Sequence, residues 1–369
     1  MTKLALITLA TSLFLQLVAV PQSAAPNPNA TQEKPKIELP DLDTVGRSSA
    51  KPPAFLFRLV KTIDSPVRSY FFKMLPGGAS VALIDYAGGS VNIYSTASGS
   101  PTRTISAPKE CQLSLATFSV DLKFLACRTG GATTIFDFGD GRKLGELKGT
   151  EPNEKLGDYF TPHRFVSDDT ILVNRKFVGR VLSALQFWSV SERKLIGSIE
   201  LDTADPALGV DCDYDGRYCV VMGRSGNITV YDVPSKKPLV LLQGHTAQVA
   251  SEVISQDRLW LCSAGLDGTI RLWDLHNHNV IKTIPIPTTP LQFGKLAVDL
   301  SPDKQLLALV ANAKAFIIDV ASGQVVQVLS DYSSVAGFTF GAIGFSSEGN
   351  SIVATGSAAV HVYHRTTRE

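Results

Sequence analysis

The sequence has no excess of charge of either sign, because 35 Lys and Arg residues face 34 Asp and Glu residues in a chain of 369. A protein that holds a phosphate backbone usually carries a basic patch or stripe, so this balance argues against nucleic acid as a partner. The sequence also has no Gly-x-Ser-x-Gly, no His-Glu-x-x-His and no phosphate-binding glycine loop. It therefore offers no linear motif for catalysis.

The six histidines do not form a metal-binding pattern. His276 and His278 lie in a predicted turn without a cluster of cysteines or carboxylates beside them, so we interpret this segment as a solvated turn. His361 and His364 are three positions apart on one predicted strand and should point to opposite faces of the sheet. We expect neither a metal ion nor a cofactor.

The five cysteines raise the question of disulfides. Cys212 and Cys219 stand on the two arms of one predicted hairpin, where they form either a cross-strand disulfide or two small core residues. Cys111 and Cys127 fall in one repeat unit but do not align in register, so no bridge is expected between them. We expect Cys262 to be a free thiol in the core.

The N-terminus resembles an export signal. Lys3 is followed by a largely apolar run over residues 4–20, and small residues such as Ala24 follow it. The alternative is an uncleaved membrane anchor, but 17 residues that include Thr and Gln are short and polar for a span. We expect residues 1–24 to be a signal peptide, with no membrane span after its removal and a secreted or periplasmic location. Residues 25–53 are rich in proline and lack aromatics, which predicts a disordered linker.

A repeat from residue 54 to residue 369 predicts the fold. The third strand of each unit ends in an aromatic or apolar residue, at intervals of 42 to 45 residues apart from one interval of 52. This period is typical of β-propellers with four strands in each blade. The longer interval indicates an insertion near the third unit. These strand ends are Tyr94, Phe136, Trp188, Tyr231, Trp273, Ile318 and Tyr363.

The turn between the first and second strands gives the same count. It recurs seven times, at residues 74–78, 118–121, 166–169, 212–216, 254–257, 300–303 and 345–349. Fourth strands follow only six of the units, and residues 57–63 supply the missing one from the start of the repeat region. We therefore predict an all-β, seven-bladed β-propeller of four-stranded antiparallel blades. An N-terminal strand completes the last blade and closes the ring, which removes an exposed sheet edge.

One unit resembles the WD40-repeat family. Gly244 and His245 match the family's Gly-His, and residues 263–275 contain its Trp-Asp pair at Trp273 and Asp274. The resemblance implies a hydrogen-bonded structural set made of His245, Ser263, Asp267 and Trp273. The other units keep only the Asp or the Trp of this pattern. The resemblance also implies a rigid, non-catalytic platform for protein or peptide partners.

We expect the partner to bind at one face of the propeller, where the loops between blades and those between second and third strands gather. The insertion at residues 151–162 mixes charges with two adjacent aromatics, and several arginines fall in or beside the second-to-third-strand loops. Exposed aromatics and arginines are typical anchors of interfaces, although ordinary solvated loops have a similar composition. The candidate contact residues are Tyr159, Phe160, Arg128, Arg175, Arg180 and Arg224.

The alternative function is a propeller enzyme of the lactonase or quinoprotein type, which acts on a small molecule in the central channel. Such an enzyme needs several polar or metal-binding residues on the innermost strands. Asp211 and Asp299 are candidates, but they are isolated carboxylates, and a hard cation needs six or more oxygen ligands. We therefore predict a monomeric, non-catalytic scaffold of the cell envelope or the secreted space.

Overall fold

The computed structural model consists of strands and turns in its described part, and none of these segments forms a helix long and apolar enough to cross a membrane. The predicted signal peptide, the linker to residue 53, residues 151–158 of the insertion and Arg180 lie outside the described residues. The structure describes residues 55–64, 72–74, 80–85, 89–119, 121–130, 132–147, 159–178, 181–202, 204–213, 215–288, 296–312, 314–329, 342–355 and 359–367.

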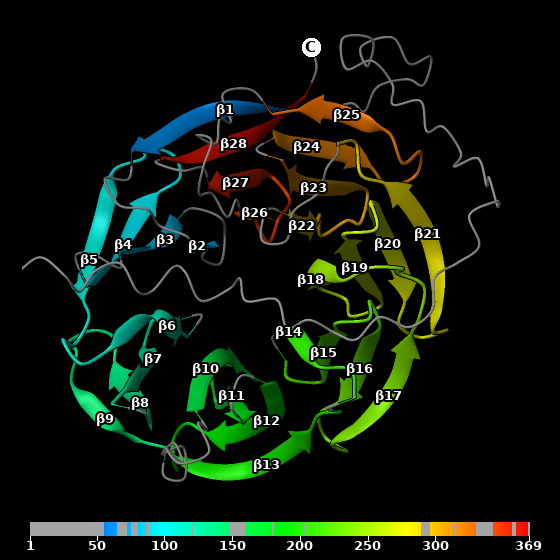
Figure 1. Cartoon of the computed structure of the whole chain (residues 1–369). Coiled ribbons are helices and arrows are strands. Elements are labelled where there is room, and N and C mark those ends of the chain that lie inside the picture. The colour runs from blue at the N-terminus through cyan, green and yellow to red at the C-terminus, as the bar shows by residue number, and fades with distance from the viewer. Residues whose placement is uncertain are drawn as a thin grey trace, which may run out of the picture. The chain divides into compact units, whose positions relative to one another are not determined.

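Consecutive strands form groups of four in which all the described pairs are antiparallel, and the order can be followed in Figure 1. The first three groups are β2 (Phe72–Met74), β3 (Ser80–Asp85), β4 (Ser90–Ser95) and β5 (Pro101–Ser106); β6 (Gln112–Phe118), β7 (Phe124–Thr129), β8 (Ala132–Asp137) and β9 (Lys143–Glu146); and β10 (Tyr159–Val166), β11 (Ile171–Val178), β12 (Val181–Ser189) and β13 (Lys194–Glu200). The next three are β14 (Ala207–Cys212), β15 (Tyr218–Gly223), β16 (Ile228–Asp232) and β17 (Lys237–Leu242); β18 (Val249–Ile254), β19 (Trp260–Gly265), β20 (Thr269–Asp274) and β21 (Asn279–Pro285); and β22 (Leu296–Leu300), β23 (Leu306–Ala311), β24 (Lys314–Asp319) and β25 (Val325–Val328). These sheets confirm the predicted all-β class and the four-stranded antiparallel unit.

The last group takes its fourth strand from the other end of the sequence. It consists of β26 (Ala342–Phe345), β27 (Ser351–Thr355), β28 (Ala359–Thr367) and β1 (Phe55–Asp64), in the order β1-β28-β27-β26. In Figure 1 the blue β1 runs beside the red β28, and the two pair from Phe55 opposite Thr367 to Asp64 opposite Ala359. Residues about 300 positions apart in the sequence thus lie on one sheet.

One pair of groups shares a sheet. Strands β10 to β13 and β14 to β17 are joined only by the pairing of Leu182 with Ala207, so the eight-stranded sheet consists of two groups of four. The first strands of successive groups also contact one another, including β6 with β10, β14 with β18, β18 with β22, and β22 with β26. Residues on these first strands can therefore interact from one group to the next.

Within a group, the inner strands are more buried than the outermost strand, and their sequences are correspondingly more apolar. In β23 all six residues are buried, and the strand reads as the apolar run Leu306–Ala311 because neighbouring sheets cover both of its faces. In the outer strand β17 most residues are exposed, and Leu241 is 50% exposed. The second and third strands of the groups therefore supply most of the core.

In the first turns that contain Ser119, Ser255 and Ser301, the turn is held by the serine and an aspartate two residues later. The Ser255 hydroxyl donates to Asp257 (2.6 Å) and accepts from the backbone N–H of Trp260 (2.9 Å). Ser301 makes the same two hydrogen bonds with Asp303 and Leu306. Side chains of this kind satisfy backbone groups that a tight turn leaves without a partner, which explains why the signature recurs along the chain.

Seven clusters of buried apolar side chains lie between neighbouring groups. The largest packs Leu272 of β20 against Leu309 of β23 and Phe316 of β24. The cluster between the last group and the first contains Val362 of β28 and Leu83 of β3. Burial of apolar surface between sheets is thus the main stabilising contribution to this part of the chain.

Candidate partner-binding site

Four planar side chains stack at one end of strands β7, β10 and β11. The rings of Tyr159 and Phe177 are nearly parallel, with an interplanar angle of 5° and centroids 4.5 Å apart. The Arg128 guanidinium carbon lies 5.5 Å from the centroid of the Tyr159 ring, and that of Arg175 lies 5.9 Å from the centroid of Phe177. We call Arg128, Tyr159, Phe177 and Arg175 the arginine–aromatic stack.

Strand pairing positions the members of the stack. Tyr159 is the first residue of β10 and lies directly opposite Phe177 on β11. Arg175 is two positions before Phe177, so the two side chains project from the same face of β11. The Arg175 Nε donates a hydrogen bond to the Thr161 hydroxyl at 3.2 Å, which fixes its stem. Arg128 comes from β7 of the neighbouring group, which contacts β10.

The two guanidinium groups of the stack have aromatic rings, not carboxylates, as their described neighbours. Among the described residues, the observed ion pairs involve neither Arg128 nor Arg175. Burial lowers the pKa of Arg175, whereas the nearby Tyr159 opposes this shift. The π faces of the two rings provide the favourable contacts for the cations instead. The site is therefore electropositive, with an aromatic centre.

The structure brings together three of the predicted contact residues, namely Arg128, Tyr159 and Arg175. The prediction that Phe160 offers a contact surface is wrong, because its side chain is only 4% exposed and strand alternation turns it away from Tyr159. Arg224 is exposed in the turn between β15 and β16 and belongs to another group. Sequence reasoning missed Phe177, although its spacing from Arg175 on one strand was a usable signal.

The four residues implied by the family resemblance form a continuous hydrogen-bonded set. His245 interacts through Nδ1 with Asp267 at 2.9 Å and through Nε2 with the Ser263 hydroxyl at 2.8 Å. The Trp273 indole N–H donates to the same hydroxyl at 2.8 Å. Burial lowers the pKa of His245, which favours the neutral ring. Each polar group thus has a partner within the set, as a structural role requires.

Burial alone raises the pKa of Asp267, but hydrogen bonds bring it below its ordinary value. The donors are the Thr269 side chain at 2.8 Å, the Thr246 backbone at 3.0 Å and His245. The carboxylate is therefore ionised at neutral pH and orients the ring of His245. This arrangement ties the segment before β18 to the β19–β20 turn.

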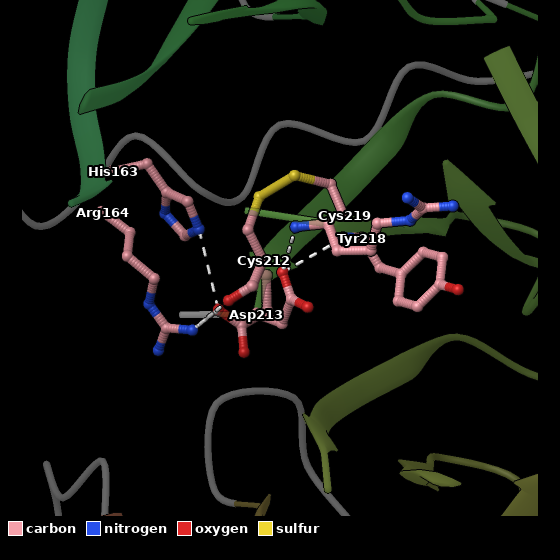
Figure 2. Close-up of a disulfide and its surroundings, with 8 residues drawn as sticks. His163, Arg164, Cys212, Asp213, Tyr218 and Cys219 are labelled. Atoms are coloured by element: carbon pink, nitrogen blue, oxygen red, sulfur yellow. Dashed lines mark hydrogen bonds and ion pairs between the residues drawn. A yellow bond between two sulfur atoms is a disulfide. The ribbon is translucent and has the colours of Figure 1, made fainter. Parts of the chain in front are cut away.

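Two disulfides lie within single groups. Cys212 and Cys219 are directly opposite on β14 and β15, with Cα atoms 4.0 Å apart, and form one bridge (Figure 2). Cys111 and Cys127 form the other, with Cα atoms 5.6 Å apart. The expectation that these two cysteines do not bridge is wrong, because the β6–β7 register shifts between Gln112 and Thr117 and brings Cys111 beside β7. Cys262 is free and buried.

Charged side chains on the innermost strands connect several groups. The Arg164 guanidinium on β10 pairs with Asp211 on β14 at 2.8 Å and donates a hydrogen bond to the Cys212 carbonyl. The His163 Nε2 lies 3.8 Å from the same carboxylate. Figure 2 shows both side chains beside the Cys212–Cys219 bridge. On β22, Asp299 accepts hydrogen bonds from the backbone N–H groups of Leu300 (2.9 Å) and Phe345 (2.6 Å).

The carboxyl groups on these inner strands have raised pKa values. Burial, and next the charge of Asp211, raises the pKa of Glu252 to about 8. Burial raises the pKa of Asp299 to about 7, although its two backbone hydrogen bonds oppose the shift. Burial also raises the pKa of Asp211 against the effect of Arg164. Burial, with the charges of Arg175 and Arg164, holds the pKa of His163 well below its ordinary value.

This inner-strand cluster comprises His163, Arg164, Asp211, Glu252 and Asp299. Within the described residues, no group of three or more His, Cys, Asp or Glu side chains has an arrangement that could hold a metal ion. Sequence reasoning named Asp211 and Asp299 but missed Glu252. Its charge interaction with Asp211 spans two groups, and no local pattern reveals it.

Comparison with known proteins gives matches to part of the chain. Residues 236–274, which contain the complete His245–Trp273 set, match the family described as WD domain, G-beta repeat. Over 125 residues the chain is 33% identical to the U3 small nucleolar RNA-associated protein 21 homolog of Schizosaccharomyces pombe, and this match covers 33% of the chain and 14% of that protein. It is 28% identical over 127 residues to the WD repeat-containing protein 36 of Homo sapiens. This match covers 34% of the chain and 13% of that protein.

A longer match joins the chain to the Pre-mRNA-processing factor 19 of Bos taurus, with 25% identity over 214 residues. It covers 56% of the chain and 40% of that protein. The chain thus spans less than half the length of each of these three relatives.

Proposed function

We propose that this chain, a member of the WD40-repeat family, is a scaffold that binds a protein partner and does not catalyse a reaction. The observation that carries the proposal is the arginine–aromatic stack. Arg, Tyr and Phe are enriched in the cores of protein interfaces. Tyr159, Phe177 and the two guanidinium groups form a pre-organised, partly exposed surface at the strand ends of two neighbouring groups.

The proposed architecture is a closed seven-bladed propeller. Seven four-strand groups and seven apolar clusters support it, because each cluster lies between two neighbouring groups and one of them lies between the last group and the first. The pairing of β1 with β28 supports closure of the ring by the N-terminal strand. A closed ring gives the stack a rigid base, so that little ordering entropy is lost on binding.

We also place the scaffold outside the cytoplasm, as a secreted or periplasmic monomer. The apolar run at residues 4–20 supports export, and two disulfides are typical of oxidising compartments. The balanced charge of the chain supports a protein rather than a nucleic acid as the partner.

The proposal is tested by quantitative affinity capture with variants of the stack. Tyr159→Ala combined with Arg175→Glu removes one ring and reverses one charge, so captured partner should fall at least tenfold. A control, Leu241→Ala with Lys237→Glu, removes one exposed apolar side chain and reverses one charge on strand β17, and it should capture as much partner as the native chain. Equal capture by all three chains would exclude the stack as the binding site.

A further inference from the structure

Among the described residues, the two arginines of the stack use their faces for the aromatic rings and leave most of their N–H donors without a protein partner. A guanidinium group carries five N–H donors in its plane, and stacking on a ring occupies none of them. In the described part of the chain, the Arg175 Nε has a hydrogen-bond partner in Thr161, and no side-chain hydrogen bond of Arg128 is observed. Both arginines are partly exposed, so their remaining donors can reach a ligand.

The charge of Arg175 acts on its surroundings without local compensation. It is one of the charges that hold the pKa of His163 well below its ordinary value. A carboxylate paired with Arg175 would offset this effect, but no such ion pair exists among the described residues. The stack therefore produces a positive potential that a negatively charged ligand would neutralise.

Apolar surface borders the charged groups. Tyr159 and Phe177 are both partly exposed, so the stacked pair itself offers apolar ring surface. Partly exposed aromatic rings favour apolar side chains of a partner. A ligand that satisfies the whole surface thus combines negative charge with apolar groups over a short distance.

We propose that the partner of the stack presents an acidic peptide segment, in which Asp or Glu carboxylates pair with Arg128 and Arg175 and neighbouring apolar side chains contact Tyr159 and Phe177. This inference rests on the proposed function and adds the chemical class of the partner. Planar carboxylates match the fork geometry of guanidinium groups and accept two parallel hydrogen bonds from each. The face of each cation is already held against a ring, so its orientation is fixed before the partner arrives.

A random peptide library displayed on phage and selected against the purified full chain tests this inference. Selected peptides should be enriched in Asp and Glu next to apolar residues. The variant Arg128→Gln with Arg175→Gln should lose this enrichment, whereas Arg224→Gln, an exposed arginine in another group, should keep it. Thermal unfolding of each variant shows whether it is folded before selection.

Affinity measurements on the most enriched peptide complete the test. The double variant should bind it at least tenfold more weakly, and binding to the native chain should weaken as salt rises from 50 to 300 mM because the contact is ionic. Enrichment of neutral or basic peptides, or no enrichment, would overturn the inference. If a partner is then still captured through the stack, the proposed function stands without its acidic character; if capture through the stack also fails, both are wrong.

Discussion

Replacing Glu252 by Gln is expected to change how the free energy of unfolding depends on pH. In the folded chain Glu252 keeps its proton up to a pKa of about 8, whereas a glutamate without this environment has a pKa of 4.5. Between these values the unfolded chain has lost the proton and the folded chain still binds it. The free energy of unfolding therefore falls as pH rises through this window, and Gln, which does not titrate, removes the fall.

The size of the effect follows from the width of the window. Each pH unit between about 4.5 and about 8 costs the native chain about 1.4 kcal/mol through this one group. The variant should thus gain several kcal/mol relative to the native chain between the two ends of the window. Below pH 4 the difference between the two chains should be constant, because both states of the native chain then bind the proton.

Other groups of the inner-strand cluster also affect how the free energy of unfolding depends on pH, and the direction of each effect follows from its pKa shift. Asp299 and Asp211 also have raised pKa values and lower the stability as pH rises, Asp299 up to about pH 7. His163 has a lowered pKa, so it acts in the opposite direction and only below its ordinary value of 6.5. Arg164 and Arg175 stay charged over this range. Burial raises the pKa of the Cys262 thiol, so this group stays neutral. These contributions are common to both chains and cancel to first order in their difference.

Urea unfolding followed by tryptophan fluorescence at pH values from 4 to 9 provides the assay. A control, Glu192→Gln, changes an exposed glutamate on a turn and should give a curve parallel to that of the native chain. Asp211→Asn removes the neighbouring charge that raises the pKa of Glu252. It should therefore reduce the slope of the unfolding free energy against pH between pH 6.5 and 8. Parallel curves for the native chain and Glu252→Gln would refute the assignment of a buried, protonated Glu252.

Two further outcomes concern the hydrogen-bonded set and the disulfides. His245→Ala should lower the free energy of unfolding by about 3 kcal/mol, because it removes the two hydrogen bonds of the buried ring, to Ser263 and Asp267, together with its packing. Trp273→Phe should cost about 1 kcal/mol more than its lost packing, because the Ser263 hydroxyl loses the indole N–H. Equal urea midpoints for native and His245→Ala chains would show that the set is not structural. Replacing Cys212 and Cys219 together by Ala should lower the free energy of unfolding by about 2.5 kcal/mol. Replacing Cys111 and Cys127, which close a longer loop, should lower it by about 3 kcal/mol. Reductant should produce the same losses in the native chain, and unchanged melting temperatures with reductant would contradict the presence of the bridges.

The repeated turns and strands could be predicted from the sequence because their causes are local. The Ser-x-Asp turn satisfies its own backbone groups within six residues, so its signature is visible in each unit that carries it. The His245–Trp273 set was found for a similar reason, since its spacing is fixed by one hairpin and the strand before it. Local rules thus account for the four-stranded unit.

Features that depend on irregular register were missed or predicted wrongly. The register shift between Gln112 and Thr117 moves Cys111 next to Cys127, and simple counting from the turn cannot reveal it. The pairing of β10 with β11 also shifts, between Pro162 and Arg164. Without the strand's start and register, the sequence did not show which of the adjacent Tyr159 and Phe160 faces the core.

Interactions between neighbouring groups could not be predicted from the sequence either. The arginine–aromatic stack joins Arg128 to residues more than 30 positions later, and the charge of Asp211 raises the pKa of Glu252 in the next group. Such contacts depend on how sheets pack side by side, which the repeat period does not specify. The sequence could therefore name Arg128, Tyr159 and Arg175 as candidates but could not show that they join Phe177 in one stack.

Site-specific photo-crosslinking tests the central claim most directly, namely that the stack binds a protein partner. A benzophenone amino acid in place of Tyr159 keeps an aromatic ring at the centre of the stack, and the same amino acid in place of Leu241 serves as the control on β17. After illumination of cells that make the protein, position 159 should give a discrete crosslinked protein and position 241 should not. No adduct at position 159, or equal adducts at both positions, would contradict the account.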